Sequence, residues 1–262
     1  MKVLRLNIGI TLLLASTVLP SAFAQTGTIT TASAGNWLSI VAPDSIAAGF
    51  GNGFSAGNTS ATSLPLPVSL GNAIVTVTDS SGTKLPASLF LVSTGQINYL
   101  IPPAAALGKG TISATANGTT YTGNIEIANI SPAIFTANNN GAGVAAAQII
   151  RVGSDGTVTN ESPFQVGVLS YTTSPIDLTA GKVYLVLYGT GIRRHSGNPV
   201  KASIGGVLVP VLYAGSQGTF PGLDQINLGP LPSTLAGTGK GDVNLIVTVD
   251  GIQANTSRIN IK

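Results

Sequence analysis

The chain has 262 residues, of which 8% are charged, with one histidine and no cysteine. The lack of cysteine excludes thiolate metal sites, cysteine nucleophiles and disulfide bridges. Lys2 and Arg5 lie in an expected signal segment and account for two of the 12 Lys and Arg, so ten remain against nine Asp and Glu. This near-neutral balance, without a basic cluster, excludes nucleic acid as a partner.

Residues 1–24 have the pattern of an export signal. A basic start precedes the apolar stretch 8–19, and Ala22-Phe23-Ala24 matches the A-x-A cleavage pattern. We therefore expect export, with a mature chain that begins at Gln25 and resides in the periplasm, at the cell surface or outside the cell. An uncleaved anchor helix is the alternative, and no later segment is apolar enough to span a membrane.

The first predicted module covers residues 35–128 and follows a polar segment, 25–34, which we expect to be disordered or a loose edge strand. Apolar and polar residues alternate over 73–78, and the stretch 89–92 is apolar on both faces, as in a buried strand. Asn117-Gly118 then predicts a type I′ turn into the closing strand, because these residue types readily adopt positive φ angles.

Residues 129–169 form a predicted connector that is too apolar for a flexible linker. Its apolar piece 144–152, a turn and Thr157-Val158-Thr159 predict a hairpin, which we expect to pack on one or both modules. The second module covers 170–262. Its last strands meet at Asp250-Gly251, which is again a signal for a type I′ turn.

One short pattern occurs twice. Gln96-Ile97-Asn98 and Gln225-Ile226-Asn227 are each followed by proline and then by Gly-Lys-Gly. This duplication predicts an all-β fold of two tandem immunoglobulin-like β-sandwich modules with a packed β-hairpin connector. On a strand the Ile faces the core, and we expect the two amides to bond backbone groups of the neighbouring loop and close the end of each module. Ligand binding at both copies is the alternative.

Four further strings make the chain similar to a known family. They are Ser131-Pro132-Ala133-Ile134-Phe135-Thr136, Tyr188-Gly189-Thr190-Gly191, Ile204-Gly205-Gly206 leading to Tyr213-Ala214-Gly215, and Phe220-Pro221-Gly222-Leu223-Asp224 before the second Gln-Ile-Asn. With that pattern they resemble the uncharacterised immunoglobulin-like C-terminal domain family found in secreted proteins of acidobacteria and related soil bacteria. Each half is more loosely similar to IPT/TIG-type domains. The resemblance implies fold and export but no activity, because the family has no assigned catalytic or binding residues.

Arg193, Arg194 and His195 form the most polar loop of the second module. Two arginines can grip a carboxylate or an anionic sugar bidentately, so these three residues are the candidate contacts for a ligand or partner. An exposed loop tip without a ligand is the competing interpretation. His195 is the only histidine and cannot build a His-rich zinc site.

Gly53-Phe54-Ser55-Ala56-Gly57 matches the G-x-S-x-G pattern of serine hydrolases, but the residues that follow favour a loop over the required helix. Glu126 and Glu161 are the only glutamates, and no two acidic residues share a short motif. Neither a glycosidase pair nor a calcium loop is therefore indicated. We predict no catalytic, cofactor-binding or metal-binding residue.

These features predict an exported, non-enzymatic immunoglobulin-like protein that acts in cell-surface or extracellular interaction by adhesion, scaffolding or binding. The expected partner is an envelope protein, an extracellular protein or a glycan. Self-association through open sheet edges is a further prediction, since sandwich sheets leave edge strands unpaired. The alternative function is a carbohydrate-binding or polysaccharide-acting secreted protein that uses the loops 189–198 and 215–224 with exposed aromatic residues.

Overall fold

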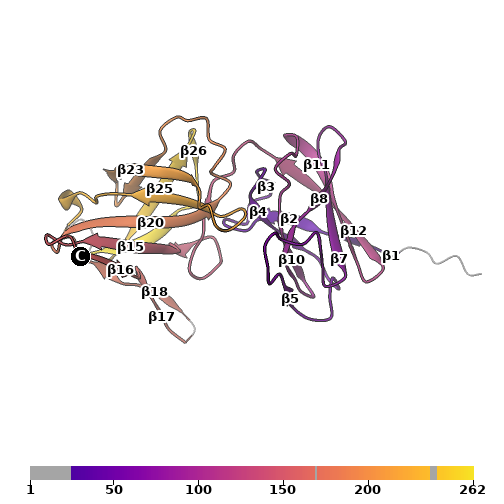
Figure 1. The fold of residues 1–262 in the computed structure, drawn as a ribbon, viewed down its shortest axis with the longest axis horizontal. Helices are drawn as coiled ribbons and strands as arrows, with labels where there is room; N and C mark the ends of the chain where they lie inside the picture. The colour runs from indigo at the N-terminus through magenta and orange to yellow at the C-terminus, as the bar shows by residue number, and fades with distance from the viewer. Residues whose placement is uncertain (1–24, 169, 237–240) are drawn as a thin grey trace, which may run out of the picture.

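The computed structural model describes residues 25–168, 170–236 and 241–262, and the predicted export signal at 1–24 lies outside them. Two β-sandwiches lie side by side along the long axis of the molecule (Figure 1). The described residues contain one short 3-10 helix, Ser233–Leu235, and among them no helix has the length and apolar character to cross a membrane. The predicted all-β fold of two tandem immunoglobulin-like modules is confirmed.

The first module is a sandwich of two sheets around one core. One sheet has the order β1 (Gln25–Thr28), β12 (Thr119–Ile127), β11 (Gly108–Ala116), β7 (Ala73–Thr78), β6 (Ser69–Leu70), with β3 (Ile40–Val41) beside β12 and β8 (Lys84–Ala87) beside β7. The other has the order β2 (Thr30–Ser33), β4 (Ile46–Phe50), β10 (Gln96–Leu100), β9 (Leu89–Val92), β5 (Thr59–Ser60). In β7, Val75 and Val77 are buried and Ile74 is exposed, which is the alternation that the sequence predicts.

Residues 25–34 form two edge strands rather than a disordered segment. The chain runs parallel to β12 in β1 and then crosses over to pair with β4 in β2. Ile29 is buried at the crossing, and the hydroxyls of Thr31 and Tyr99 are hydrogen-bonded inside the core at 2.8 Å. The sequence does not predict these buried strands, because the side chains buried here are small Thr and Ala residues that form no apolar pattern.

The second module repeats this architecture. One sheet has the order β16 (Val158–Glu161), β15 (Ala147–Val152), β20 (Lys182–Thr190), β24 (Asp224–Leu228), β23 (Val211–Ser216), with β13 (Ala133–Ile134) beside β20. The other has the order β14 (Gly143–Val144), β27 (Ser257–Ile261), β25 (Gly241–Val249), β21 (Lys201–Ile204), β22 (Val207–Val209), with β19 (Pro175–Ile176) beside β27 and β26 (Ile252–Gln253) beside β25. Both predicted closing turns join antiparallel strands, β11 to β12 and β25 to β26.

The connector predicted at 129–169 contributes strands to the second sandwich. β14 pairs parallel with β27 and β15 antiparallel with β20, as β1 pairs with β12 and β2 with β4 in the first module. The predicted hairpin is present as β15 and β16, and Ile149 of β15 shares a core with Leu185 and Leu187. The second sandwich therefore begins near residue 133 rather than at 170, because the sequence repeat marks only the later strands of each copy.

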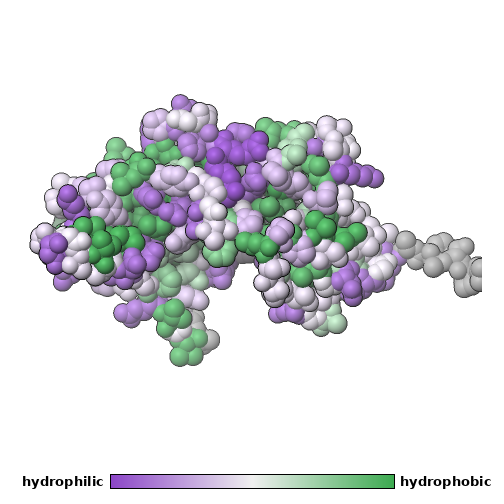
Figure 2. Space-filling model, in the orientation of Figure 1, coloured by the Kyte–Doolittle hydropathy of each residue, from purple (hydrophilic) through white to green (hydrophobic). Residues whose placement is uncertain are grey.

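A second hairpin, β17 (Phe164–Val166) with β18 (Tyr171–Thr173), forms a two-stranded sheet of its own. Figures 1 and 2 show it projecting from the second module with hydrophobic side chains on its surface, where Val166 is 70% exposed. At its base the hydroxyl of Thr173 hydrogen-bonds the carboxylate of Asp242 in β25. The hairpin is thus an anchored projection beyond the two sandwich sheets.

Candidate functional site

The repeated Gln-Ile-Asn pattern occupies the same place in both modules, on β10 and β24. Ile97 and Ile226 are fully buried. On the opposite face the Gln96 amide donates to Asn98 Oδ1 at 2.6 Å, and Gln225 and Asn227 repeat this bond at 2.8 Å. We expected these amides to bond the backbone of a neighbouring loop. They bond each other instead, because residues i and i+2 of a strand project from the same face.

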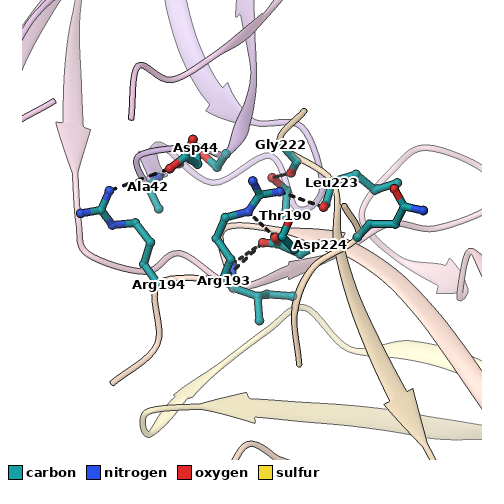
Figure 3. Close-up of polar contacts among 12 residues, drawn as sticks. Ala42, Asp44, Thr190, Arg193, Arg194, Gly222, Leu223 and Asp224 are labelled. Carbon is teal, nitrogen blue, oxygen red and sulfur yellow. Dashed lines mark hydrogen bonds and ion pairs between the residues drawn. The ribbon is translucent and has the colours of Figure 1, made fainter. Parts of the chain in front are cut away.

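Arg193 is bound to a buried carboxylate at the start of β24. Its Nε donates to Asp224 Oδ1 at 2.6 Å, and its Nη2 donates to the Leu223 carbonyl at 2.8 Å (Figure 3). The backbone N–H groups of Ile192 and Arg193 donate to the other carboxylate oxygen, at 2.7 and 3.2 Å. Burial raises the pKa of Asp224, and the hydrogen bonds from Ile192 and Arg193 oppose that rise.

The loop that carries Arg193 is shaped by the turn after β20. Gly191 has a φ of 73°, and a Cβ there would collide with the carbonyl oxygen of Ser131. This tight turn brings the backbone of residues 192 and 193 onto Asp224. The Arg193 guanidinium is therefore held in a structural ion pair with Asp224 instead of standing free on the loop.

Arg194 and His195 are separated from Arg193 by their surroundings. Arg194 Nη1 donates to the Pro103 carbonyl at 3.0 Å and lies 3.9 Å from Asp44, so it reaches across to the first module (Figure 3). His195 Nε2 lies 3.3 Å from the Ala214 carbonyl and faces an open groove beside Tyr213. The three consecutive residues thus have three different neighbourhoods, and as candidate ligand contacts they remain predictions.

Direct hydrogen bonds join the two modules at the end of β20. The backbone N–H of Ile46 donates to Thr190 Oγ1 at 2.9 Å, and the same hydroxyl donates to the Gly222 carbonyl at 2.8 Å. Thr190 is fully buried. Gly222 has a φ of 74°, and a Cβ there would lie 2.6 Å from Ile46 and 2.8 Å from Leu100. Only glycine allows the two modules to approach this closely.

A second set of contacts joins the modules beside β3. Ser131 Oγ donates to the Ile40 carbonyl at 2.7 Å. A Cβ on Gly35 would lie 2.7 Å from the Cβ of Ala133, so the two backbones also pack tightly here. We call the contacts of Thr190, Gly222, Arg194, Ser131 and Gly35 the module junction. These contacts hold the two sandwiches against each other at two places, the end of β20 and the segment beside β3.

An apolar pocket of about 560 Å³ opens at this junction. Leu64, Leu66 and Phe90 line it from the first module, and Phe220 and Pro221 line it from the second. Leu64 is 53% exposed and Phe220 59% exposed. The pocket has the volume of a small-molecule site, but its lining includes no ionisable side chain.

The residues considered for catalysis do not meet. Ser55 Oγ donates to the Gly57 carbonyl at 2.7 Å within a loop of the first module, whereas His195 belongs to the second. No helix follows Ser55, as the nucleophile turn of a serine hydrolase would require. Within the described ranges no three His, Cys, Asp or Glu side chains gather as a metal site would require.

No protein-family model and no curated protein matches the chain. Among solved structures, domains 5-6 of the S-layer protein SbsC match over 89% of this chain and 96% of that chain, with 14% identity and a TM-score of 0.26. Murine CEACAM1b matches over 90% and 100%, with 10% identity and a TM-score of 0.21. The plexin A4 extracellular region matches over 89% of this chain, which spans only 18% of that chain, with 9% identity and a TM-score of 0.26.

Similarities at these TM-scores support no conclusion about this chain, so the fold assignment rests on the sheets described above. Membership of the family of secreted soil-bacterial proteins remains a prediction.

Sequence reasoning missed the module junction, although its signal is present in the sequence. Ser131, Thr190 and Gly222 each belong to one of the strings that carry the family resemblance. These strings are far apart along the chain, and the sequence alone does not show that they meet. In the structure they gather where the two sandwiches touch.

Proposed function

We propose that the chain is an exported, non-enzymatic, two-module immunoglobulin-like protein that acts in cell-surface or extracellular interaction. The observation that carries this proposal is the module junction. Thr190 and Gly222 fix one sandwich against the other, so surfaces from both modules are presented in a constant relative orientation. Interdomain contacts within one chain otherwise allow relative motion by default.

Exposed apolar side chains on this fixed framework support the same proposal. Val166 and Val168 on the projecting hairpin are 70% and 100% exposed, and Leu64 and Phe220 are exposed at the junction pocket. Isolated exposed apolar residues are common, but contiguous ones mark surfaces that bind partners. The proposed partners are an envelope protein, an extracellular protein or a glycan, with self-association through edge strands as a further route.

Binding of purified residues 25–262 to glycan arrays and to arrayed envelope proteins tests this function. We expect at least one component to bind, and we expect binding to weaken in Thr190→Val, which loosens the junction. Thr248→Val is the matched control, because the structure gives no side-chain hydrogen bond for Thr248 among the described residues. Failure to bind any component, together with a monomeric state at high concentration, would overturn the proposal.

Export and the hydrolytic alternative have separate tests. Residues 1–24 fused to an alkaline phosphatase that folds only outside the cytoplasm should give phosphatase activity, and Ala24→Arg should block cleavage of the fusion.

For the hydrolytic alternative, Ser55→Ala and His195→Ala are compared on polysaccharides and esters. Any turnover that both variants retain in full excludes Ser55 and His195 as its catalytic residues.

A further inference from the structure

Trp37, the only tryptophan of the chain, stands on the surface at the module junction. Its side chain is 36% exposed and its ring lies 5.7 Å from that of Phe50, tilted by 55°. Its backbone has a φ of 62°, in the left-handed region that bulky residues rarely adopt. A strained and half-exposed aromatic residue is a candidate for function. Its backbone strain costs free energy, and its exposed ring is not needed to fill the core.

The turn that carries Trp37 is held from both sides. The N–H of Trp37 donates to the Ser33 carbonyl at 3.0 Å, and the N–H of Ser33 donates to the Leu38 carbonyl at 2.8 Å. Next to it, the N–H of Ala34 donates to the Ile46 carbonyl at 3.0 Å. The ring is therefore presented on a fixed turn. A preorganised aromatic face loses little conformational entropy when a ligand binds.

An asparagine-rich loop of the second module packs against this turn. Asn138, Asn139 and Asn140 are all exposed, and a Cβ on the following Gly141 would lie 3.2 Å from Trp37 Cδ1. A hydrogen bond from Asn255 Nδ2 to the Gly141 carbonyl, at 2.9 Å, fixes the position of the loop. Trp37 and this loop come from different modules, so they lie side by side only while the junction is closed.

Several hydrogen-bonding groups of this loop are available to a ligand. Within the described parts of the chain the structure gives the Asn139 amide no side-chain partner, and Asn140 uses only Oδ1, which accepts from the N–H of Ala142 at 2.8 Å. Neither the aromatic pair nor the asparagines carry a charge. A flat apolar ring beside neutral amide donors and acceptors fits a sugar ring, whose C–H face can stack on the indole while its hydroxyls bond the amides.

We propose that Trp37, Asn139 and Asn140 form a binding site for a neutral glycan that lies across the module junction. Trp37 stacks on one sugar ring, Phe50 supports the indole, and the two amides bond hydroxyl groups of the same or the next ring. This inference rests on the proposed interaction function and names the ligand class for it. A protein partner would use the same apolar rings but would not depend on the amides.

Two measurements test the site on residues 25–262. The first is native gel electrophoresis through neutral polysaccharides, namely β-glucan, galactomannan, arabinan, dextran and hydroxyethylcellulose. The second is titration with the hexasaccharide of whichever polysaccharide retards the protein, read by tryptophan emission, which reports Trp37 alone. We expect retardation by at least one polysaccharide and a change in emission that saturates.

The variants separate a glycan site from a general effect. Trp37→Ala should weaken binding about tenfold or more, and Asn139→Ala about threefold to tenfold, measured by retardation and by calorimetry. Asn139→Ala also covers the case in which Trp37→Ala fails to fold. Leu208→Ala is the control, because Leu208 is a 73% exposed apolar side chain on edge strand β22 of the second module. It should bind as the unchanged protein does.

Three outcomes would overturn the site: no retardation by any of the five polysaccharides, binding that survives both Trp37→Ala and Asn139→Ala, or equal loss in Leu208→Ala. Binding to an envelope protein that depends on Trp37 but not on Asn139 would also overturn the glycan assignment. That last result would leave the proposed interaction function standing, so the two failures are distinguishable.

Discussion

Replacing Arg193 with alanine would leave a buried carboxylate without its cation. In the intact protein Asp224 Oδ1 is bound by the guanidinium at 2.6 Å, and the Asp224 side chain is fully buried. In the variant Oδ1 has no remaining partner among the described residues, while Oδ2 keeps the N–H groups of residues 192 and 193. Removing one member of a buried ion pair costs about 3–5 kcal/mol, because the other charge stays desolvated.

The size of this effect can be followed by thermal unfolding. The second module has roughly 130 residues, for which the unfolding entropy is about 270 cal/mol/K, so about 3–5 kcal/mol corresponds to a fall in Tm of about 10–20 °C. Circular dichroism of residues 25–262, heated with and without urea, gives both the Tm and the free energy of unfolding. We expect the second module to account for the loss.

Arg194→Ala is the matched control, since it removes the same side chain one residue later. The Arg194 side chain is 38% exposed and lies 3.9 Å from Asp44, so its loss should cost less than about 1 kcal/mol. The double variant Arg193→Met with Asp224→Leu should recover much of the stability lost in Arg193→Ala, because no charge is then left buried. A cost for Arg193→Ala no larger than that for Arg194→Ala would refute this reasoning.

Three further changes test other parts of the structure. Thr190→Val removes the bonds to Ile46 and Gly222, and should cost about 1–3 kcal/mol and broaden the distance distribution in small-angle scattering, whereas Thr248→Val should do neither. Ser257→Ala removes a buried hydroxyl that has no hydrogen-bond partner among the described residues, so urea unfolding should show equal or greater stability, by up to about 1 kcal/mol. Hydrogen bonds from Ser81, Ala106 and Thr83 lower the pKa of Asp79 to about 2, below its ordinary value of about 3.9. Its stabilising effect is therefore present above pH 4 and is lost as the pH falls toward 2, and Asp79→Asn should flatten that part of the urea midpoint curve without changing its shape above pH 5.

Local patterns in the sequence predicted the strands well. Alternation at Val75 and Val77 and the two glycine turns correspond to paired strands in the structure. Strand β15 belongs to the predicted hairpin, but the sequence places that hairpin in a connector, because nothing in residues 147–152 shows that they pair with β20. Such assignments depend on contacts between distant residues, which a local pattern does not contain.

The candidate site was harder to predict for the same reason. Thr190 and Ile46 are 144 positions apart, and no property of either residue points to the other. From the sequence, Arg193 looks like an unpaired cation on a loop. Its partner Asp224 lies 31 residues later, directly before the second Gln-Ile-Asn pattern, and nothing local links the two residues. Trp37 carries no local signal in the sequence, because its exposure and its place beside Gly141 depend on how the two modules dock.

The terminal strands have a mechanical consequence. β1 starts at one end of the long axis and the C-terminus lies at the other (Figure 1). β1 pairs in parallel with β12. β27 pairs antiparallel with β25 and in parallel with β14 and β19. Tension between Gln25 and Lys262 would therefore be carried at the two ends of the molecule by the ladder bonds of β1 and β27. Between these two ladders the load passes through the covalent chain from β12 to β13 and through the contacts of the module junction, and the few non-covalent contacts of the junction would be expected to yield first.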